Sequence, residues 1–210
     1  MKIVLIGAPG SGKGTQASLI AKEFNIAHIS TGEIFRENIE QQTALGLQIK
    51  EIIDNGNLCP DDLTIKLVEN RLTQPDCENG YLLDGFPRNL NQAEALDKFN
   101  KPDKVINIDI PLDIIENRII GRRSCVKCGK SFHVNFIGQA KICPDCGGEL
   151  IIRKDDNPTS VHERLQVFKL RSEPVRDYYL NKNILFDVDG NCSVDKVFEQ
   201  IKSVLNNDKN

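Results

Sequence analysis

Short apolar runs alternate with longer amphipathic stretches along most of this chain. The apolar runs predict buried strands at residues 2–6, 27–30, 81–83, 105–110 and 184–188. The amphipathic stretches predict helices at residues 13–24, 31–54, 61–73, 89–99, 112–121, 158–181 and 193–205. Strands separated by helices predict an α/β fold, in which a parallel sheet has helices on both faces. Ligands bind such sheets beyond the carboxyl ends of the strands.

Two segments interrupt the alternation. Residues 31–60 place two helical patterns between successive strands, and residues 122–155 lose helical periodicity while they collect cysteines and glycines. Both segments indicate insertions that cover the ligand-binding edge of the sheet.

Length and composition fit one main domain with such insertions. The chain has 210 residues, of which 40% are hydrophobic and 27% charged, and its formal net charge is -3. Non-specific binding to nucleic acid or to an anionic membrane usually needs a basic excess. No apolar run is long enough to span a bilayer, and the N-terminus lacks the pattern of a signal peptide. We therefore expect a cytoplasmic protein that binds neither nucleic acid nor membrane. A monomer is a separate expectation, which these observations do not test.

A glycine-rich segment joins the first predicted strand to the first predicted helix. Residues 7–15 read Gly-Ala-Pro-Gly-Ser-Gly-Lys-Gly-Thr. Backbone N–H groups of such a loop can wrap a phosphate chain, because glycines leave room for the phosphate oxygens, and Lys13 adds a mobile positive charge. The common phosphate loop has Ser or Thr directly after the lysine, where its hydroxyl binds magnesium. Here Gly14 stands at that place and Thr15 follows, so we expect the metal to depend on water and a carboxylate elsewhere.

That carboxylate is predicted at Asp84, directly after the apolar strand 81–83. The segment continues as Gly85-Phe86-Pro87-Arg88, a tight turn from which Arg88 projects. An aspartate at the end of a buried strand beside a phosphate loop is well placed to order magnesium. The alternative is a turn in which Asp84 caps the next element.

Arginines flank the second insertion on both sides. Arg118 and Arg122 are four residues apart and are predicted to share one face of an amphipathic helix, while Arg153 and Arg164 follow the insertion. Arginine suits bidentate phosphate contacts, so next to a phosphate loop these side chains predict a clamp over transferring phosphates. Each one alone is also typical of an exposed ion pair. The acids at 155–156 are predicted to hold the arginines.

Four of the seven cysteines form two Cys-x-x-Cys pairs, namely Cys125 with Cys128 and Cys143 with Cys146. A glycine follows each pair, at 129 and 147, where a tight knuckle needs a residue that tolerates positive φ. Two such knuckles can surround a tetrahedral zinc ion, and four thiolates leave no open position, so the metal should be structural. Two disulfides or four free thiols are the alternatives.

Together these motifs resemble the adenylate kinase family, in its bacterial form with a long, zinc-bearing lid. The resemblance covers essentially the whole chain and rests on the loop at 7–16, the segment 30–36, the segment 83–88 with Gln92, Gly121-Arg122-Arg123 and the segment 153–156. It implies a P-loop NTPase-type parallel sheet flanked by helices, with a core at 1–29, 60–121 and 160–210, a helical AMP-binding domain at 30–59 and a lid at 122–159. It also implies reversible transfer of the γ-phosphoryl group of ATP to AMP, which gives two ADP, with Mg²⁺ bound to ATP, in adenine nucleotide homeostasis.

The resemblance also implies a role for individual residues. Those for ATP are Gly10, Ser11, Gly12, Lys13, Gly14, Thr15, Arg118, Arg122, Ser131, Phe132 and Cys192. Those for AMP are Thr31, Arg36, Asn57, Leu58, Cys59, Gly85, Phe86, Pro87, Arg88, Gln92, Arg153 and Arg164, with Gln92 at the edge of the adenine. The catalytic set is Lys13, Asp84, Arg88, Arg122, Arg153 and Arg164, and the zinc ligands are Cys125, Cys128, Cys143 and Cys146.

The chain departs from the family pattern at two places, and three other functions are compatible with parts of the sequence. The lid lacks an Asn-Pro-Pro stretch after Phe136, which leaves the lid contacts to the ATP base open, and Cys59 replaces an aliphatic residue. One rival is a kinase for another nucleoside monophosphate, such as UMP or CMP. A second is a nucleic-acid-binding ATPase that uses a zinc ribbon, which the acidic net charge disfavours. A third, a non-catalytic nucleotide sensor, is disfavoured by the intact Lys13, Asp84 and arginines.

Overall fold

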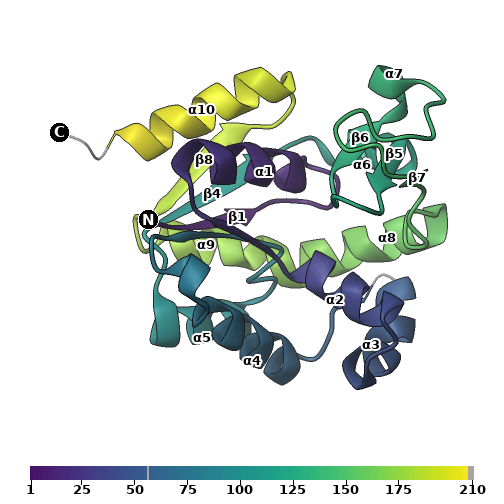
Figure 1. Cartoon of the computed structure of the whole chain (residues 1–210). Helices are drawn as coiled ribbons and strands as arrows, with labels where there is room; N and C mark the ends of the chain where they lie inside the picture. Colours follow the sequence, from purple (N-terminus) through teal and green to yellow (C-terminus); the bar gives the residue numbers. More distant parts are fainter. Residues whose placement is uncertain (56, 208–210) are drawn as a thin grey trace.

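A computed structural model describes residues 1–55 and 57–207 of the chain. Within these residues the central sheet has five parallel strands in the order β2-β3-β1-β4-β8. Figure 1 labels β1, β4 and β8 of this sheet, with α1 and α10 nearby. The strands are β1 (Lys2–Ile6), β2 (Ala27–Ser30), β3 (Tyr81–Asp84), β4 (Lys104–Asp109) and β8 (Leu185–Asp189). The predicted strands and the α/β fold class are confirmed, with strand ends that shift by at most one residue.

Helices cover both faces of this sheet because side chains alternate along each strand. Ile3 and Leu5 of β1 pack with α1 and α10, whereas Val4 and Ile6 pack with α4, α5 and α9. The bounds of these helices are α1 (Lys13–Phe24), α4 (Asp61–Leu72), α5 (Leu90–Asn100), α9 (Glu173–Leu180) and α10 (Val194–Asn206). In the described residues, no helix is long and apolar enough to cross a membrane.

The first insertion is a pair of helices, α2 (Thr31–Glu40) and α3 (Ala44–Asp54). Ser30 and Thr43 cap them through side-chain oxygens that accept from the backbone N–H of Glu33 and Gly46. An added Cβ at Gly46 would lie 2.0 Å from the carbonyl oxygen of Asn38, so only glycine allows the two helices to meet this closely. The two predicted helical patterns are confirmed.

The second insertion holds a small antiparallel sheet that periodicity did not predict. Its strands are β5 (Arg122–Cys125), β6 (Ser131–His133) and β7 (Leu150–Ile151) in the order β6-β5-β7, with a short helix α7 (Val134–Ile137). Strands of two to four residues are too short for a period-2 pattern to stand out, which is why the sequence indicated only a loss of helix.

The helix predicted at 112–121 ends before Arg122, so it cannot present Arg118 and Arg122 on one face. A 3-10 turn at Leu112–Ile114 leads into α6 (Ile115–Ile120), and Arg122 already belongs to β5. Arg118 and Arg122 therefore do not share a helix face, and that prediction was wrong. The cause is pairing in the small sheet: Arg122 lies opposite His133, whose ring would come within 2.1 Å of a Cβ added at Gly121.

The predicted helix at 158–181 is continuous but changes geometry in the middle. It runs through α8 (Pro158–Val167), a π-helical turn at Phe168–Ser172 and α9. Pro174 has no N–H and its ring would clash with the carbonyl one α-turn earlier, and the wider π turn accommodates it. The turn also directs the Ser172 hydroxyl to donate to the Arg88 carbonyl at 2.7 Å, next to the candidate site.

Candidate active site

The glycine-rich loop has the backbone of a phosphate cradle. Gly7, Gly10 and Gly12 adopt positive φ, and α1 begins at Lys13. At Gly7 a Cβ would lie 2.6 Å from the Ile108 carbonyl oxygen, so the loop passes against β4 too closely for any side chain. Lys13 Nζ donates to the carbonyls of Gly7 and Ala8, at 2.8 Å each. The lysine is thus held over the loop at the N-terminus of α1, where anions bind.

Asp84, the last residue of β3, lies beside this loop, as its place at the end of the predicted strand indicated. A Cβ at Gly14 would be 3.6 Å from Asp84 Oδ2, and His28 Nε2 lies 3.9 Å from the same oxygen. Burial acts to raise the pKa of Asp84, but His28 and the positive charge of Lys13 outweigh it, so the pKa lies below its ordinary value. The carboxylate is therefore ionised next to the loop. It does not cap α5, because Asn89 does.

Arginines from separate elements converge opposite Lys13. Arg122 at the start of β5 donates from Nε to Asp156 Oδ2 at 2.8 Å, and a second bond joins its Nη2 to Oδ1. Arg164 on α8 donates to Asp155 at 3.0 Å and to Asp156 at 3.2 Å. Asp155 and Asp156 do contact two of the arginines. Arg153 instead donates to two serines of the small sheet, Ser124 at 2.8 Å and Ser131 at 3.2 Å.

The acids do not compensate this positive charge fully. Burial, joined by the charges of Arg88, Arg164 and Arg122, lowers the pKa of Lys13 to about 8 despite the opposing effect of Asp84. Burial, Arg36 and Arg122 together lower the pKa of Arg153 to about 9. Lowered pKa values of cations mean that the charged forms repel one another and lack solvation. Such a cluster favours the arrival of a polyanion, which supplies the missing negative charge.

A pocket opens beside the cluster, between the first insertion and the carboxyl edge of the sheet. Its lining includes most of the residues that the resemblance placed around AMP, namely Thr31, Arg36, Asn57, Leu58, Cys59, Gly85, Arg88, Gln92 and Arg164. Phe86 does not line it, because this side chain is fully buried in the core with Val4 and Leu83. Pro87 and Arg153 also lie outside the lining.

The residues expected to bind ATP outside the phosphate loop include two separate groups. Arg118 on α6 donates to the Gly190 carbonyl at 3.2 and 3.3 Å, and Cys192 follows in the same loop, with its thiol 3.2 Å from Asp189. Arg118 and the loop around Cys192 are therefore neighbours. Ser131 and Phe132 belong to the second insertion, where Phe132 packs against its cysteine core.

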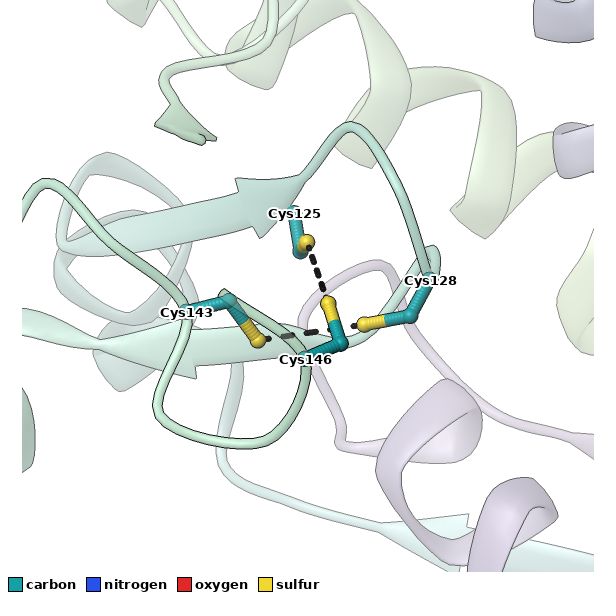
Figure 2. Close-up of side chains that lie close together, drawn as sticks. All are labelled: Cys125, Cys128, Cys143 and Cys146. Atoms are coloured by element: carbon teal, nitrogen blue, oxygen red, sulfur yellow. Dashed lines mark hydrogen bonds between the residues drawn. The ribbon is translucent and has the colours of Figure 1, made fainter. Parts of the chain in front are cut away.

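The second insertion has a four-cysteine cluster. Sγ atoms of Cys125, Cys128, Cys143 and Cys146 lie within 4.8 Å of one another, with Cys125–Cys146 at 3.5 Å and Cys128–Cys143 at 3.8 Å (Figure 2). A tetrahedral ion with metal–sulfur bonds of about 2.3 Å would place its ligand sulfurs about 3.8 Å apart. The glycines after both pairs adopt positive φ, 70° at position 129 and 71° at position 147, as predicted. The cluster can hold a metal ion.

Several pocket residues and one neighbour were not named as site residues from sequence. Thr64, Phe35 and Ile53 line the pocket, and Asp61 hydrogen bonds to Gln92 just behind it. Asp61 and Thr64 lie in the first turn of α4, where polar residues are usual for capping and dipole reasons alone. No local signal separates those roles from a place at a binding site.

The fold and site define the class first: a phosphate-loop α/β protein whose lysine, carboxylate and converging arginines suit phosphoryl transfer between nucleotides. Sequence comparison identifies the family within that class. A family model described as adenylate kinase matches residues 5–184. The adenylate kinase of Clostridium acetobutylicum is 51% identical over 98% of the chain and 99% of its own length. That of Clostridium tetani is 49% identical over 98% of the chain and 98% of its own length. That of Clostridium botulinum strain Hall is 49% identical over the full length of both. The chain belongs to the adenylate kinase family of ATP:AMP phosphotransferases.

Proposed function

We propose that this chain transfers the γ-phosphoryl group of ATP to AMP, with ATP at the phosphate loop and AMP in the pocket beside it. One observation carries the assignment. Arg88 and Arg164 line the pocket and are also charged neighbours of Lys13, so the two sites share one set of cations. Thr31 and Arg36 would bind the acceptor phosphate, and Gln92 would bind its base.

The reaction needs position and charge more than covalent help. An oxygen of the AMP phosphate attacks the γ-phosphorus of ATP, the bond from that phosphorus to the β,γ-bridging oxygen breaks, and two ADP result. Lys13, Arg122 and Arg153 would neutralise the charge that spreads over the transferring group. Mg²⁺ bound with ATP would supply further charge neutralisation, and Asp84, ionised beside Gly14, would hold its water ligands.

The two insertions would serve as moving parts. Residues 30–59 would form the AMP-binding domain, residues 122–159 the lid, and the rest of the chain the core. A phosphate donor open to solvent would lose phosphoryl groups to water, so closure over both nucleotides protects the reaction. Asp155 and Asp156 would hold Arg164 and Arg122 in place while the lid closes.

Zinc is the metal we propose for the cysteine cluster. Four thiolates select a soft ion and close its coordination shell, which suits a structural zinc. Gly148 supports a built site, because a Cβ there would lie 2.8 Å from Cys125 Sγ and 2.6 Å from Lys127 Cβ. The ion would make the lid move as one body.

A coupled assay of ADP formation, with metal analysis of the same protein, tests the proposal. We expect ADP from ATP only when AMP is present, and about one zinc ion per chain. Faster turnover with UMP or CMP than with AMP would replace the acceptor assignment. Salt-dependent RNA or DNA binding without AMP-dependent ADP formation would favour the nucleic-acid-binding ATPase instead.

Location and assembly remain predictions of this proposal. The acidic net charge and the small-molecule substrates favour a cytoplasmic protein without nucleic-acid or membrane partners, and we propose that it is a monomer. Sedimentation at micromolar concentration, with and without nucleotide, measures the oligomeric state directly.

A further inference from the structure

The Asp61 carboxylate, in the first turn of α4, accepts hydrogen bonds from three side-chain amides of the α5 N-terminal region. Oδ1 accepts from Asn89 Nδ2 and Gln92 Nε2, both at 2.8 Å, and Oδ2 accepts from Asn91 Nδ2 at 2.9 Å. Burial acts to raise the pKa of Asp61, but these three hydrogen bonds outweigh it and hold the pKa below its ordinary value. Asp61 is therefore a pure acceptor at neutral pH.

Gln92 is held at both ends of its amide. Its Nε2 donates to Asp61, and its Oε1 accepts from the backbone N–H of Arg88 at 2.8 Å. A carboxylate cannot donate and a backbone N–H cannot accept, so a rotated amide would meet two repulsive contacts in place of two bonds. Gln92 is only 2% exposed, so bulk water offers the rotated form little compensation. One orientation of Gln92 is therefore enforced.

This orientation leaves Gln92 one N–H and one oxygen lone pair for a ligand in the pocket that it lines. A 6-aminopurine offers an amino donor at position 6 and an acceptor at N1, whereas a 6-oxopurine offers the reverse at the same two places. An amide free to rotate could match either pattern. An amide locked in one orientation matches one of them, for a base that its phosphate holds in a fixed position.

We infer that Asp61 is a specificity-determining positioning residue, which locks the Gln92 amide for a 6-aminopurine acceptor and against 6-oxopurine monophosphates such as IMP. The inference rests on the proposed function, because it requires the base of AMP to lie at Gln92. Asp61 touches neither substrate in this role. It acts through the orientation of a side chain that does.

The test compares acceptors in the full-length protein. Asp61→Asn keeps the shape but allows the new amide to donate or to accept, so of the two contacts that fix Gln92 only the Arg88 backbone N–H still favours one orientation. Asp62→Asn is the matched control, because it removes the same charge from the same helical turn at an exposed residue. We expect the ratio of kcat/KM for AMP to that for IMP to fall about tenfold in Asp61→Asn, equivalent to about 1.4 kcal/mol, and to stay unchanged in Asp62→Asn.

The ratio separates positioning from mere structural support, since partial unfolding lowers both rates equally. If Asp61→Asn lowers both kcat/KM values by the same factor, Asp61 does not set specificity and the inference is overturned. Asp61→Ser, which is smaller and also lacks a fixed acceptor, has the same expected outcome and serves if the asparagine variant does not fold. Failure of the proposed function looks different: Gln92→Leu would leave kcat/KM for AMP intact, or the wild type would form no ADP from AMP.

Discussion

Replacement of Asp156 by asparagine should destabilise the protein strongly. The Asp156 side chain is fully buried, and it bonds to Arg122 and Arg164, whose side chains are 15% and 19% exposed. Loss of one partner of a buried ion pair costs about 3–5 kcal/mol. Because Arg164 keeps Asp155 as a partner, we expect the free energy of unfolding to fall by the lower value of this range, about 3 kcal/mol. For a chain of this length, 1 kcal/mol shifts Tm by about 2–4 °C, which predicts a drop of about 6–12 °C.

Thermal unfolding of the wild type, Asp156→Asn and Asp145→Asn, followed by circular dichroism, measures this effect. Asp145 pairs with Lys130 in the same insertion, but these side chains are 43% and 47% exposed. An exposed ion pair contributes about 0–1 kcal/mol, so the control should lose no more than about 4 °C. Equal Tm values for Asp156→Asn and the wild type would refute the reasoning, since burial would then add nothing to the ion pair.

The remaining predictions concern the loop lysine and the cysteines. Lys13→Ala should lower kcat by about a hundredfold to a thousandfold without lowering Tm, and near-normal turnover would contradict its role. Because the pKa of Lys13 in the folded protein is about 8, below the ordinary 10.5, kcat/KM for ATP should decline above about pH 8. The cost of burying the Lys13 charge is fully present below pH 8 and disappears as pH rises towards 10.5, so the free energy of unfolding should gain from Lys13 over this range. A kcat/KM profile for ATP that stays flat above about pH 8 would exclude a catalytic role for the Lys13 charge. The double variant Cys125→Ser with Cys128→Ser should lose bound zinc and have a clearly lower Tm, while its kcat changes little. If the wild type contains no metal and the double variant has the same Tm as the wild type, the cysteine cluster is not a metal site.

Patterns that lie within a few consecutive residues were sufficient for most of the architecture. The apolar runs located the five strands of the central sheet in the described residues, because a buried parallel strand must be apolar on both faces. Loop glycines and Cys-x-x-Cys spacing located the phosphate cradle and the metal cluster for a similar reason. In both, the required geometry is local, and few residue types permit it.

Contacts between residues far apart in the sequence were decided only by the folded chain. Arg122 lies in a strand and not in the predicted helix because β5 pairs with β6, where its partner is His133, eleven positions away in the sequence. Gln92 obtained its orientation from Asp61, and Arg122 its partner from Asp156, across separations of 31 and 34 residues. A charged or amide side chain carries no mark of which distant partner it will meet. Candidate phosphate-binding residues could therefore be named from sequence, but the residues that orient them required the tertiary structure.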